Sequence, residues 1–537
     1  MYNIRYNKSK KIILGIFSIG IIFTCLSGYS FPHRNKTKVL FIGLDGATWN
    51  IMSPLVVEGK LPNIKRLINK GSFGNLESFH PFISEVIWTS IATGKSPDKH
   101  NIKDRLAKDP ETQELVPVTS NLRNAKAIWN ILSEYKKKAG IISYMCTWPP
   151  ENINGIMVSD RIDPANYSAK GYAFPPIETL CNKQEFENFS HIENSIFSRI
   201  KKDGPRYFYY GAEEKDNFVV NFSKHLLQKQ DFDFFCLYIR GIDILSHSFW
   251  KYTISENSAL PENDAERYKY IIKDYYIWCD KVIGEILNLA DKDTVVIIAS
   301  DHGFSARNNA NDFLIQMDRF LSSSGLSETQ KNSKVFSVVS EESDFWWLNT
   351  RYLKIKGDLS SEEFEEVKKE SKIILEDIKI KETSQQIFKA TDDTKTGFFI
   401  SVNMRAIKEN LKNHILIRDK EYDIFDFLSP FPYNGTHEKT GIILISGKNI
   451  CKNTLIKAAA IYDIAPTILY FMDLPIGKDM NGKILIEAIE NSYLRAHPVK
   501  YIDSYEENKI EPPEKPIRSP KDEEKIKQLM RSLGYIN

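Results

Sequence analysis

Carboxylates and an imidazole follow short apolar runs at several places in this 537-residue chain. Asp45 comes after KVLFIGL, Asp243 comes shortly after DFFCLYI, and Asp301 and His302 come after TVVIIAS. Such runs are typical of buried strands in a parallel sheet, whose carboxyl ends are the usual place for a ligand. Ionisable side chains are costly there unless they are paired or bind a metal. The pattern therefore predicts a metal site at one edge of a sheet.

Two further histidines extend this set. His247 lies four residues after Asp243, a spacing that places both side chains on one face of a helical turn. His437, in NGTHEKTGIILIS, is predicted to lie in a turn just before another apolar strand. Carboxylate and imidazole donors without a thiolate favour a divalent ion, zinc or manganese.

Each of these residues also has an explanation that involves no metal. These separate explanations are a strand-end turn for Asp45, a surface ion pair for Asp243 and His247, a helix cap for Asp301 and His302, and a loop position for His437. Because all of them would have to coincide, a shared metal site is the better hypothesis.

Ser84 precedes the mostly apolar stretch EVIWTSIAT, which stops at Gly94. This arrangement predicts a buried helix with Ser84 as its N-cap and Gly94 as its C-cap glycine. The N–H groups and the positive dipole end of such a helix favour a phosphoryl or sulfuryl group beside the serine oxygen. Capping alone also explains the serine, so its role as a nucleophile depends on the metal-site residues.

The alternation of strands and helices predicts an α/β fold. We expect a mostly parallel central sheet with helices on both faces, and an inserted cap subdomain. Helices are predicted over residues 61–71, 125–136 and 265–289. The expected plan is an N-terminal segment 1–30, a first catalytic part 38–302, the cap 303–436, a second catalytic part 437–500 and a polar tail 501–537.

Composition excludes several classes of protein. With 72 basic and 70 acidic residues the net charge is +2, so no overall field attracts nucleic acid as a bound scaffold. The 42% hydrophobic content is ordinary for a folded protein. The six cysteines are scattered and form no CxxC pair, which argues against a zinc–thiolate site and a disulfide framework.

Several segments together resemble the alkaline phosphatase superfamily, in particular its type I phosphodiesterase and nucleotide pyrophosphatase branch. In chain order they are VLFIGLDG, LPNIKRLINKG, SEVIWTSIATGKSPDKHNI, YIRGIDILSHSFW, VVIIASDHGF, GTHEKTGIILISG and YDIAPTILYFMDLPIGKDMNGK. The resemblance implies two divalent ions and a serine nucleophile at Ser84. It implies one ion held by Asp45, Ser84, Asp301 and His302, and the other held by Asp243, His247 and His437.

This resemblance implies a phosphodiesterase-like hydrolase that forms a phosphoseryl intermediate on a small-molecule, nucleotide or lipid phosphate ester. Transfer to an alcohol by a phosphotransferase or mutase remains an alternative, as does a non-catalytic binding protein with the same fold. The asparagine that contacts a phosphoryl oxygen in the family's nucleotide pyrophosphatases has no clear counterpart near Asp104 and Arg105, which leaves nucleotide specificity open. Ser84 is followed by EVIW rather than a CxPxR-like element, which disfavours a sulfatase.

We expect a phosphodiester to be preferred over a monoester. No arginine lies near Ser84 in sequence to balance a dianion, although folding could bring Arg105 or Arg240 to the phosphoryl group. The residues after Glu85, namely Val86, Ile87 and Trp88, are apolar, and the aromatic stretches FFCLYI, SHSFW and SDFWW are expected to line a pocket for the second substituent.

The first thirty residues predict export. Three lysines lead into IILGIFSIGIIFTCLSGY, an uncharged run that suits either a cleaved signal peptide or a membrane anchor. Positive charge before the run places the body outside the cytoplasm, in the periplasm or extracellular space, released or anchored to the membrane. Fractionation of the producing cells tests this expectation, and intact chain in the cytosol would contradict it.

Overall fold

The computed structural model describes residues 38–108, 115–192, 195–196, 198, 200, 212–253, 266–306, 313–327, 335–337, 350–357, 359–393, 397–430 and 435–506. All of them fall within the unit Lys38–Asn537. The predicted signal or anchor lies outside these residues. In the described ranges, no helix combines the length and the apolar character that crossing a membrane requires.

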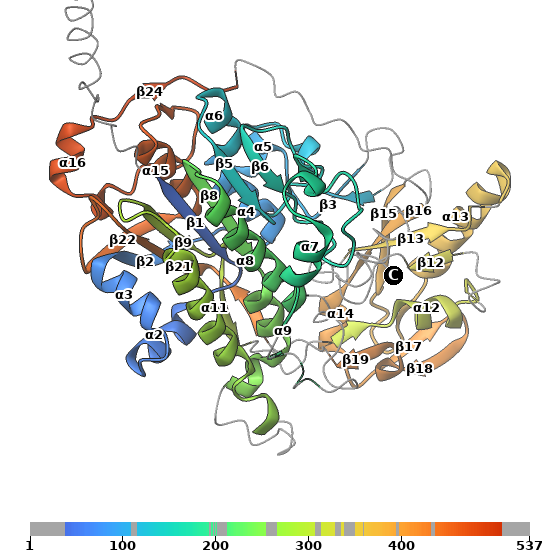
Figure 1. Cartoon of the computed structure of the whole chain (residues 1–537). Coiled ribbons are helices and arrows are strands. Elements are labelled where there is room, and N and C mark those ends of the chain that lie inside the picture. The colour runs from blue at the N-terminus through green and yellow to red at the C-terminus, as the bar shows by residue number, and fades with distance from the viewer. Residues whose placement is uncertain are drawn as a thin grey trace, which may run out of the picture. The chain divides into compact units, whose positions relative to one another are not determined.

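A nine-stranded sheet forms the centre of the fold, in the order β22-β2-β21-β9-β1-β8-β5-β6-β7 (Figure 1). The strands β22, β2, β9, β1, β8, β5 and β6 run in one direction, whereas β21 and β7 run in the opposite direction. The prediction of a mostly parallel sheet is therefore confirmed. The strands are β1 (Val39–Leu44), β2 (Gly71–Glu77), β5 (Ala139–Ile142), β6 (Gly155–Val158), β7 (Ala173–Phe174), β8 (Phe234–Ile239), β9 (Val295–Ala299), β21 (Thr440–Ser446) and β22 (Thr454–Ala460).

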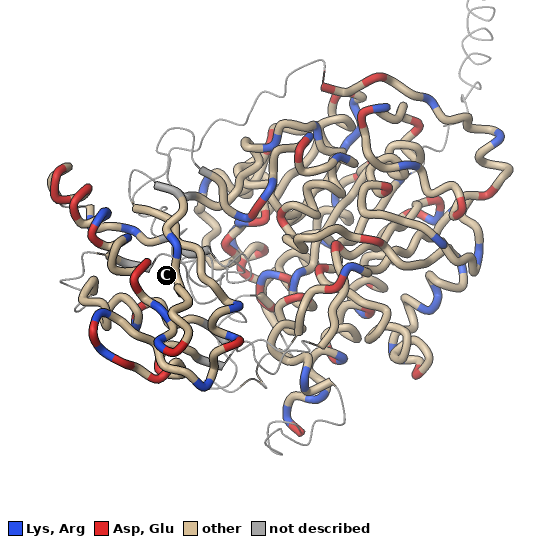
Figure 2. The backbone as a smooth tube through the Cα atoms, turned by 180° about the vertical axis from the view of Figure 1, so that it is seen from behind, with Lys and Arg blue, Asp and Glu red and all other residues tan. Residues whose placement is uncertain are grey.

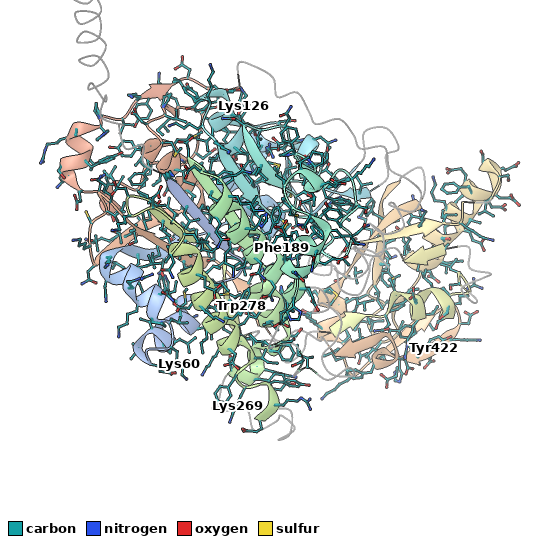
Figure 3. All side chains as sticks on the ribbon, in the orientation of Figure 1. Lys60, Lys126, Phe189, Lys269, Trp278 and Tyr422 are labelled. Atoms are coloured by element: carbon teal, nitrogen blue, oxygen red, sulfur yellow. The ribbon has the colours of Figure 1, made fainter. Side chains whose placement is uncertain are left out.

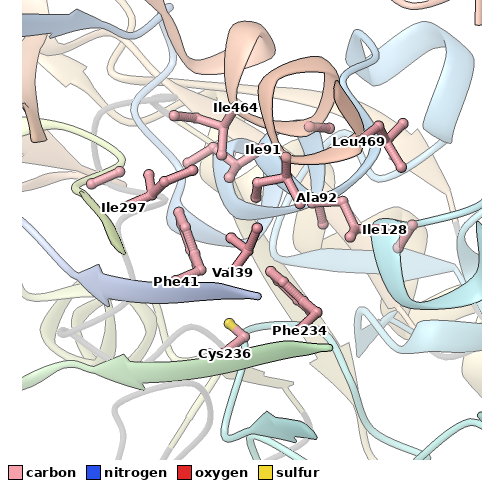
Figure 4. Packing of buried hydrophobic residues seen from close by; sticks show 14 of the residues in the cluster. Val39, Phe41, Ile91, Ala92, Ile128, Phe234, Cys236, Ile297, Ile464 and Leu469 are labelled. Carbon is pink, nitrogen blue, oxygen red and sulfur yellow. The ribbon is translucent and has the colours of Figure 1, made fainter. Parts of the chain in front are cut away.

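Alternate residues of the central strands face two different helical layers, as the period of two in a strand requires. Val39 and Phe41 of β1 point to the layer that contains α4 (Ser84–Thr93), α6 (Ile128–Glu134) and α15 (Ile464–Phe471), and Figure 4 shows this packing. Leu40 and Ile42 point to the layer that contains α2 (Trp49–Val57), α3 (Pro62–Lys70), α8 (Ala212–Lys229), α9 (Gly241–Thr253) and α11 (Ile271–Leu287). Burial of each such apolar side chain stabilises the folded state by roughly 1.5–3 kcal/mol. Helices on both faces are thus confirmed.

The predicted helices are present with shifted ends. The segments 61–71, 125–136 and 265–289 contain α3, α6 and α11. The last helix is shorter than predicted, because a turn at Lys269 and Tyr270 precedes its first residue, Ile271. Between these elements, α7 (Lys183–Phe189) packs on α8, where Phe189 contacts Phe218 and Phe222 edge to face. Figure 3 labels Phe189 among the side chains of the described residues.

Residues between Ile315 and Leu428 contribute a third buried cluster of their own. A four-stranded sheet in the order β12-β13-β16-β15 and the helix α13 (Ser361–Glu376) supply much of it. The acidic residues of α13 stand out in Figure 2, whereas both signs of charge mix over the rest of the described chain. The strands and helices are β11 (Phe313–Ile315), α12 (Met317–Ser323), β12 (Val335–Ser337), β13 (Thr350–Ile355), β14 (Lys379–Ile380), β15 (Phe388–Asp393), β16 (Gly397–Val402), α14 (Met404–Glu409), β17 (His414–Ile417), β18 (Lys420–Asp423) and β19 (Leu428–Pro430). The predicted domain limits stay predictions.

The last described segment packs on the body. Its strand β24 (Tyr501–Ile502) pairs in parallel with β23 (Ile476–Gly477). The buried Lys95 ammonium lies 2.8 Å from the Glu506 carboxylate and 2.6 Å from that of Asp479. The rest of the predicted polar tail lies outside the described residues.

The helix α4 carries Ser84 as its first residue. The predicted N-cap is wrong by one position, because Ile83 has the extended backbone of the cap and makes no side-chain capping bond. The prediction for the other end is confirmed, since Gly94 adopts a left-handed φ of 68°. Nine of the ten helix residues, all except Ser84, are buried, which holds the helix rigidly in the core.

His100, the last residue of the short helix α5 (Pro97–His100), supports α4 from within the core. The Ile102 N–H donates to its Nδ1 at 3.1 Å, so Nε2 carries the proton and donates to Ser90 Oγ at 2.9 Å. Burial, and next the charge of Arg123, lowers the pKa of His100 from 6.5 to about 3. The neutral imidazole is therefore part of the folded state.

This histidine makes stability depend on pH. The unfolded chain protonates His100 below its ordinary pKa of about 6.5, whereas the folded chain keeps it neutral down to about 3. The contribution of the neutral imidazole to the free energy of unfolding is therefore complete above pH about 6.5. It is lost as the pH falls toward about 3, by up to about 5 kcal/mol. Urea unfolding should show that the advantage of wild type over His100→Gln shrinks between pH about 7 and about 4. The control His191→Gln, at an exposed histidine, should leave the slope unchanged, and an equal slope in all three proteins would contradict the prediction.

Candidate active site

The three central strands β9, β1 and β8 are adjacent and parallel, so their carboxyl ends meet at one edge of the sheet. Asp301 and His302 follow β9, Asp45 follows β1, and Asp243 lies in the first turn of α9 directly after β8. His247 lies one helical turn farther along α9. The fold thus brings together the residues that the sequence placed after separate strands.

His437 reaches the same edge by a different route. It lies in β20 (Gly435–Glu438), which pairs antiparallel with β10 (Gly303–Ala306) and places His437 opposite Phe304. The predicted turn is therefore a strand, because backbone pairing with β10 extends it. The next strand, β21, is antiparallel to β9, so its beginning lies beside the end of β9. A residue before this strand therefore reaches the site.

Ser84, the candidate nucleophile, lies in the helical layer that contains α4. Since β2 is antiparallel to β21, it runs in the same direction as β9, and α4 begins shortly after β2 ends. Ser84 Oγ lies 3.4 Å from His302 Nε2. Its hydroxyl therefore contacts the cluster, while Ile83 takes the N-cap position of the helix.

The first group of donors consists of Asp243, His247 and His437. His437 Nε2 lies 3.1 Å from Asp243 Oδ1 and 3.0 Å from His247 Nε2, and His247 Nε2 lies 3.4 Å from the same carboxylate oxygen. Donors about 2.0–2.1 Å from a tetrahedral ion stand about 3.3–3.4 Å apart. The three separations fit a divalent ion such as zinc.

The second group surrounds His302. Its Nε2 lies 3.3 Å from Asp301 Oδ2, 3.4 Å from Ser84 Oγ and 3.6 Å from Asp45 Oδ1. These distances also suit donors that share one ion. Asp45 Oδ1 and Asp301 Oδ2 are buried and have no hydrogen-bond partner among the described residues, which is what an ion-binding oxygen requires. The two groups are neighbours, since Asp243 Oδ1 lies 3.9 Å from His302 Nε2.

Backbone carbonyls fix two of the imidazoles. His302 Nδ1 donates to the Gly303 carbonyl at 3.1 Å, and His437 Nδ1 donates to the Phe82 carbonyl at 2.9 Å. Both rings therefore present Nε2 as the atom available to a metal. Phe82 lies two residues before Ser84, which belongs to the second donor group. The bond from His437 to the Phe82 carbonyl therefore links the first donor group to the second.

The electrostatics of the cluster favour a cation. Burial, followed by repulsion from Asp243, raises the pKa of Asp45 to about 7. Burial, followed by repulsion from Asp45 and Asp243, raises the pKa of Asp301 well above its ordinary value. Burial also lowers the pKa of His302, and His437 lowers it further. Burial opposes ionisation of Asp243, but His247 and His437 together outweigh it and hold its pKa well below the usual range. A bound cation would favour ionised carboxylates and neutral imidazoles.

The two candidate arginines have different surroundings. Arg240 follows β8, and its charge acts on Asp45 and lowers the pKa of that carboxyl, although burial raises it more strongly. Arg105 is buried, and its described backbone bonds are local, to Asp104 and Val118. For Arg240 the structure thus describes an interaction with the cluster, through Asp45.

The prediction that aromatic stretches line a pocket is wrong for the stretches that the structure describes. Val86, Ile87 and Trp88 are buried in the core, FFCLYI is the fully buried strand β8, and Phe249 and Trp250 of SHSFW are buried on α9. Amphipathic spacing cannot distinguish a pocket lining from a core, because both need apolar side chains. The stretch SDFWW lies outside the described residues.

Sequence reasoning missed three residues that support the cluster. The Trp88 indole and the Tyr238 hydroxyl both donate to Asp45 Oδ2. The fully buried Phe304 ring lies against the imidazoles of His247 and His437, with centroids 5.0 Å away in each case. For Trp88 and Tyr238, the available signal was a tryptophan or tyrosine inside an otherwise apolar helix or strand. A buried indole N–H or phenol hydroxyl needs a hydrogen-bond partner.

Comparison with known proteins places this site in a family context. A family model described as type I phosphodiesterase / nucleotide pyrophosphatase matches residues 39–414. A sequence search of curated proteins finds no match.

Among solved structures, a phosphonoacetate hydrolase from Sinorhizobium meliloti 1021, in complex with phosphonoformate, is 14% identical with a TM-score of 0.44, and the match covers 81% of this chain and 95% of that one. The human ectonucleotide pyrophosphatase / phosphodiesterase 5 is also 14% identical with a TM-score of 0.44, over 83% of this chain and 97% of that one.

The geometry predicts the metal content of the protein. After equilibration with zinc or manganese, elemental analysis should find two ions per chain, and His437→Gln should retain about one because the group of Asp243 and His247 loses a donor. His225→Gln is the matched control, since His225 contacts the Leu180 carbonyl outside the cluster and its loss should leave the metal content unchanged. Active wild-type protein without metal would contradict the prediction.

Proposed function

The chain belongs to the type I phosphodiesterase / nucleotide pyrophosphatase family, whose name describes hydrolysis of phosphate esters, and on that premise we propose that it is a two-metal hydrolase with Ser84 as nucleophile. One ion would be held by Asp45, Ser84, Asp301 and His302. The other would be held by Asp243, His247 and His437. Zinc is the ion that these donors favour, and manganese is the alternative.

The position of Ser84 Oγ supports this proposal most strongly. It lies 3.4 Å from His302 Nε2, the atom around which the second donor group is arranged. Ser84 is also the first residue of a ten-residue helix, whose positive dipole end favours the negative charge of a phosphoryl group. The N-cap residue of the helix is Ile83, whereas the Ser84 hydroxyl contacts His302 Nε2 and hydrogen-bonds the Asp301 carboxyl, both in the cluster.

The chain's own residues would carry two displacement steps. Bound divalent ions would lower the pKa of the serine hydroxyl and neutralise charge on the phosphoryl oxygens. Ser84 Oγ attacks phosphorus and forms a serine–phosphate ester, while the bond to the leaving oxygen breaks and that oxygen leaves with a proton. Water then attacks phosphorus, the bond to Ser84 Oγ breaks, and the serine regains its proton.

Three further points belong to the proposal. The substrate would be a small-molecule, nucleotide or lipid phosphate ester. The body would act outside the cytoplasm, which the uncharged N-terminal run supports. If an alcohol replaced water in the second step, the same site would serve as a phosphotransferase, and product analysis with an added alcohol acceptor distinguishes the two.

The nucleophile assignment predicts a separation between turnover and metal binding. Ser84→Ala should abolish turnover, by at least about a thousandfold, because no hydroxyl remains to attack phosphorus. Its metal content should stay near that of wild type, since Asp45, Asp301 and His302 remain. Ser84→Thr is the control that keeps a hydroxyl, and it should retain measurable turnover. Undiminished turnover in Ser84→Ala would refute the assignment.

Substrate charge is tested with an aryl phosphate monoester and the matching methyl aryl diester at one pH. The diester should show the higher kcat/KM, because two ions and the seryl oxygen balance a monoanion better than a dianion. The charge of Arg240, which acts on Asp45, could reverse this order. A clear preference for the monoester that Arg240→Gln removes would overturn the diester assignment and identify the arginine as its cause.

A further inference from the structure

The two oxygens of Asp45 have different surroundings. Asp45 Oδ2 accepts a hydrogen bond from Trp88 Nε1 at 3.2 Å and another from the Tyr238 hydroxyl. Asp45 Oδ1 accepts none from the described residues and lies 3.6 Å from His302 Nε2. One oxygen is therefore occupied by the protein, and the other is directed toward the second donor group.

Both donors are fixed in this role by their chemistry. An indole N–H can only donate. The Tyr238 hydroxyl contacts Asp45 Oδ2, and since a carboxylate oxygen can only accept, the phenol is the donor in this bond. Trp88 is 0% and Tyr238 is 4% exposed, and neither polar tip can turn to solvent instead.

Close packing holds the two rings in place. Trp88 and Tyr238 meet edge to face with centroids 5.1 Å apart. Both lie over Gly43 of β1, where an added Cβ would stand 2.9 Å from the Trp88 ring and 3.3 Å from the Tyr238 ring. The glycine two residues before Asp45 therefore makes room for the donors that hold Asp45.

The arrangement connects the elements of the site. Trp88 lies one helical turn after Ser84 on α4, Tyr238 lies on β8, and Asp45 follows β1. The helix that carries the candidate nucleophile thus also orients a carboxylate across from it.

From these contacts we propose that Trp88 and Tyr238 are positioning residues that leave Asp45 a single oxygen for the ion beside Ser84. The inference rests on the proposed function, because it concerns one of the two ions. With both donors present, the carboxylate binds through Oδ1 in one orientation. Without them it can rotate or offer both oxygens, so the ion is held less tightly and Ser84 is aligned less well.

A pair of single-hydroxyl variants tests this role. Tyr238→Phe removes one donor to Asp45 and keeps the ring. Tyr144→Phe is the matched control, since Tyr144 belongs to the same aromatic cluster, with its ring centroid 5.6 Å from that of Trp88, but its hydroxyl donates to the Trp88 carbonyl at 2.7 Å. Zinc dissociation constants for the two sites are measured by chelator competition, and the absorption spectrum of the cobalt-substituted protein reports on coordination.

We expect Tyr238→Phe to weaken one of the two sites about tenfold or more and to alter the cobalt spectrum, while the other site stays as in wild type. Tyr144→Phe should change neither quantity. Trp88→Phe removes the other donor and should weaken the same site.

The outcomes separate the inference from the proposed function. Equal losses of zinc affinity in Tyr238→Phe and Tyr144→Phe would show a packing effect and overturn the inference. Equal losses of zinc affinity at the two metal sites would do the same. Unchanged zinc binding in Tyr238→Phe and Trp88→Phe, with two ions in wild type, would overturn the inference alone. Wild-type protein that binds no ion would overturn both.

Discussion

Three buried carboxylates at one edge of the sheet are the constraint on which this site depends. Asp45, Asp243 and Asp301 reach that edge because β1, β8 and β9 are adjacent and parallel. Their mutual repulsion and their burial raise the pKa of Asp45 and Asp301, and only nearby positive charge relieves it. Burial also opposes ionisation of Asp243, but the adjacent imidazoles of His247 and His437 outweigh it and hold the pKa of that carboxyl well below its usual range. The donor set is thus arranged for cations, and a neutral protein interior would not tolerate it otherwise.

Rigid packing around the cluster follows from the same constraint. Charged groups held a few ångströms apart need neighbours that do not move. Buried helix α4, the Phe304 ring against two imidazoles and the Trp88–Tyr238 pair on Asp45 provide such neighbours. The backbone carbonyl before the nucleophile, that of Phe82, also holds His437. The apolar core and the polar site are therefore parts of one packed structure, so core substitutions near Gly43 or Trp88 should act on chemistry as well as on stability.

The family assignment and the geometry contribute different information. The family defines the class of reaction, hydrolysis of phosphate esters. The geometry concerns this chain's own residues: Ser84 Oγ beside His302, two donor groups that meet at Asp243, and Arg240 whose charge reaches Asp45. The fold alone does not fix the choice of substrate.

The sequence by itself determined the strands, the order of the elements and the residues of the cluster. Apolar runs predicted β1, β8 and β9, and the polar residues after them predicted where a ligand would bind, because local periodicity and strand ends are properties of short segments. The family resemblance divided those residues into two groups, a division that stays a prediction.

Only the tertiary structure decided how distant segments meet. His437 precedes its strand, and it reaches the cluster because β21 runs antiparallel to β9, a direction that no local pattern encodes. Trp88 and Tyr238 had the pattern of ordinary core residues, and their polar tips found Asp45 only when helix and strands packed together. Such contacts depend on the register and direction of segments far apart in sequence, 193 residues apart for Asp45 and Tyr238 and 355 for Phe82 and His437, which hydrophobic periodicity does not specify.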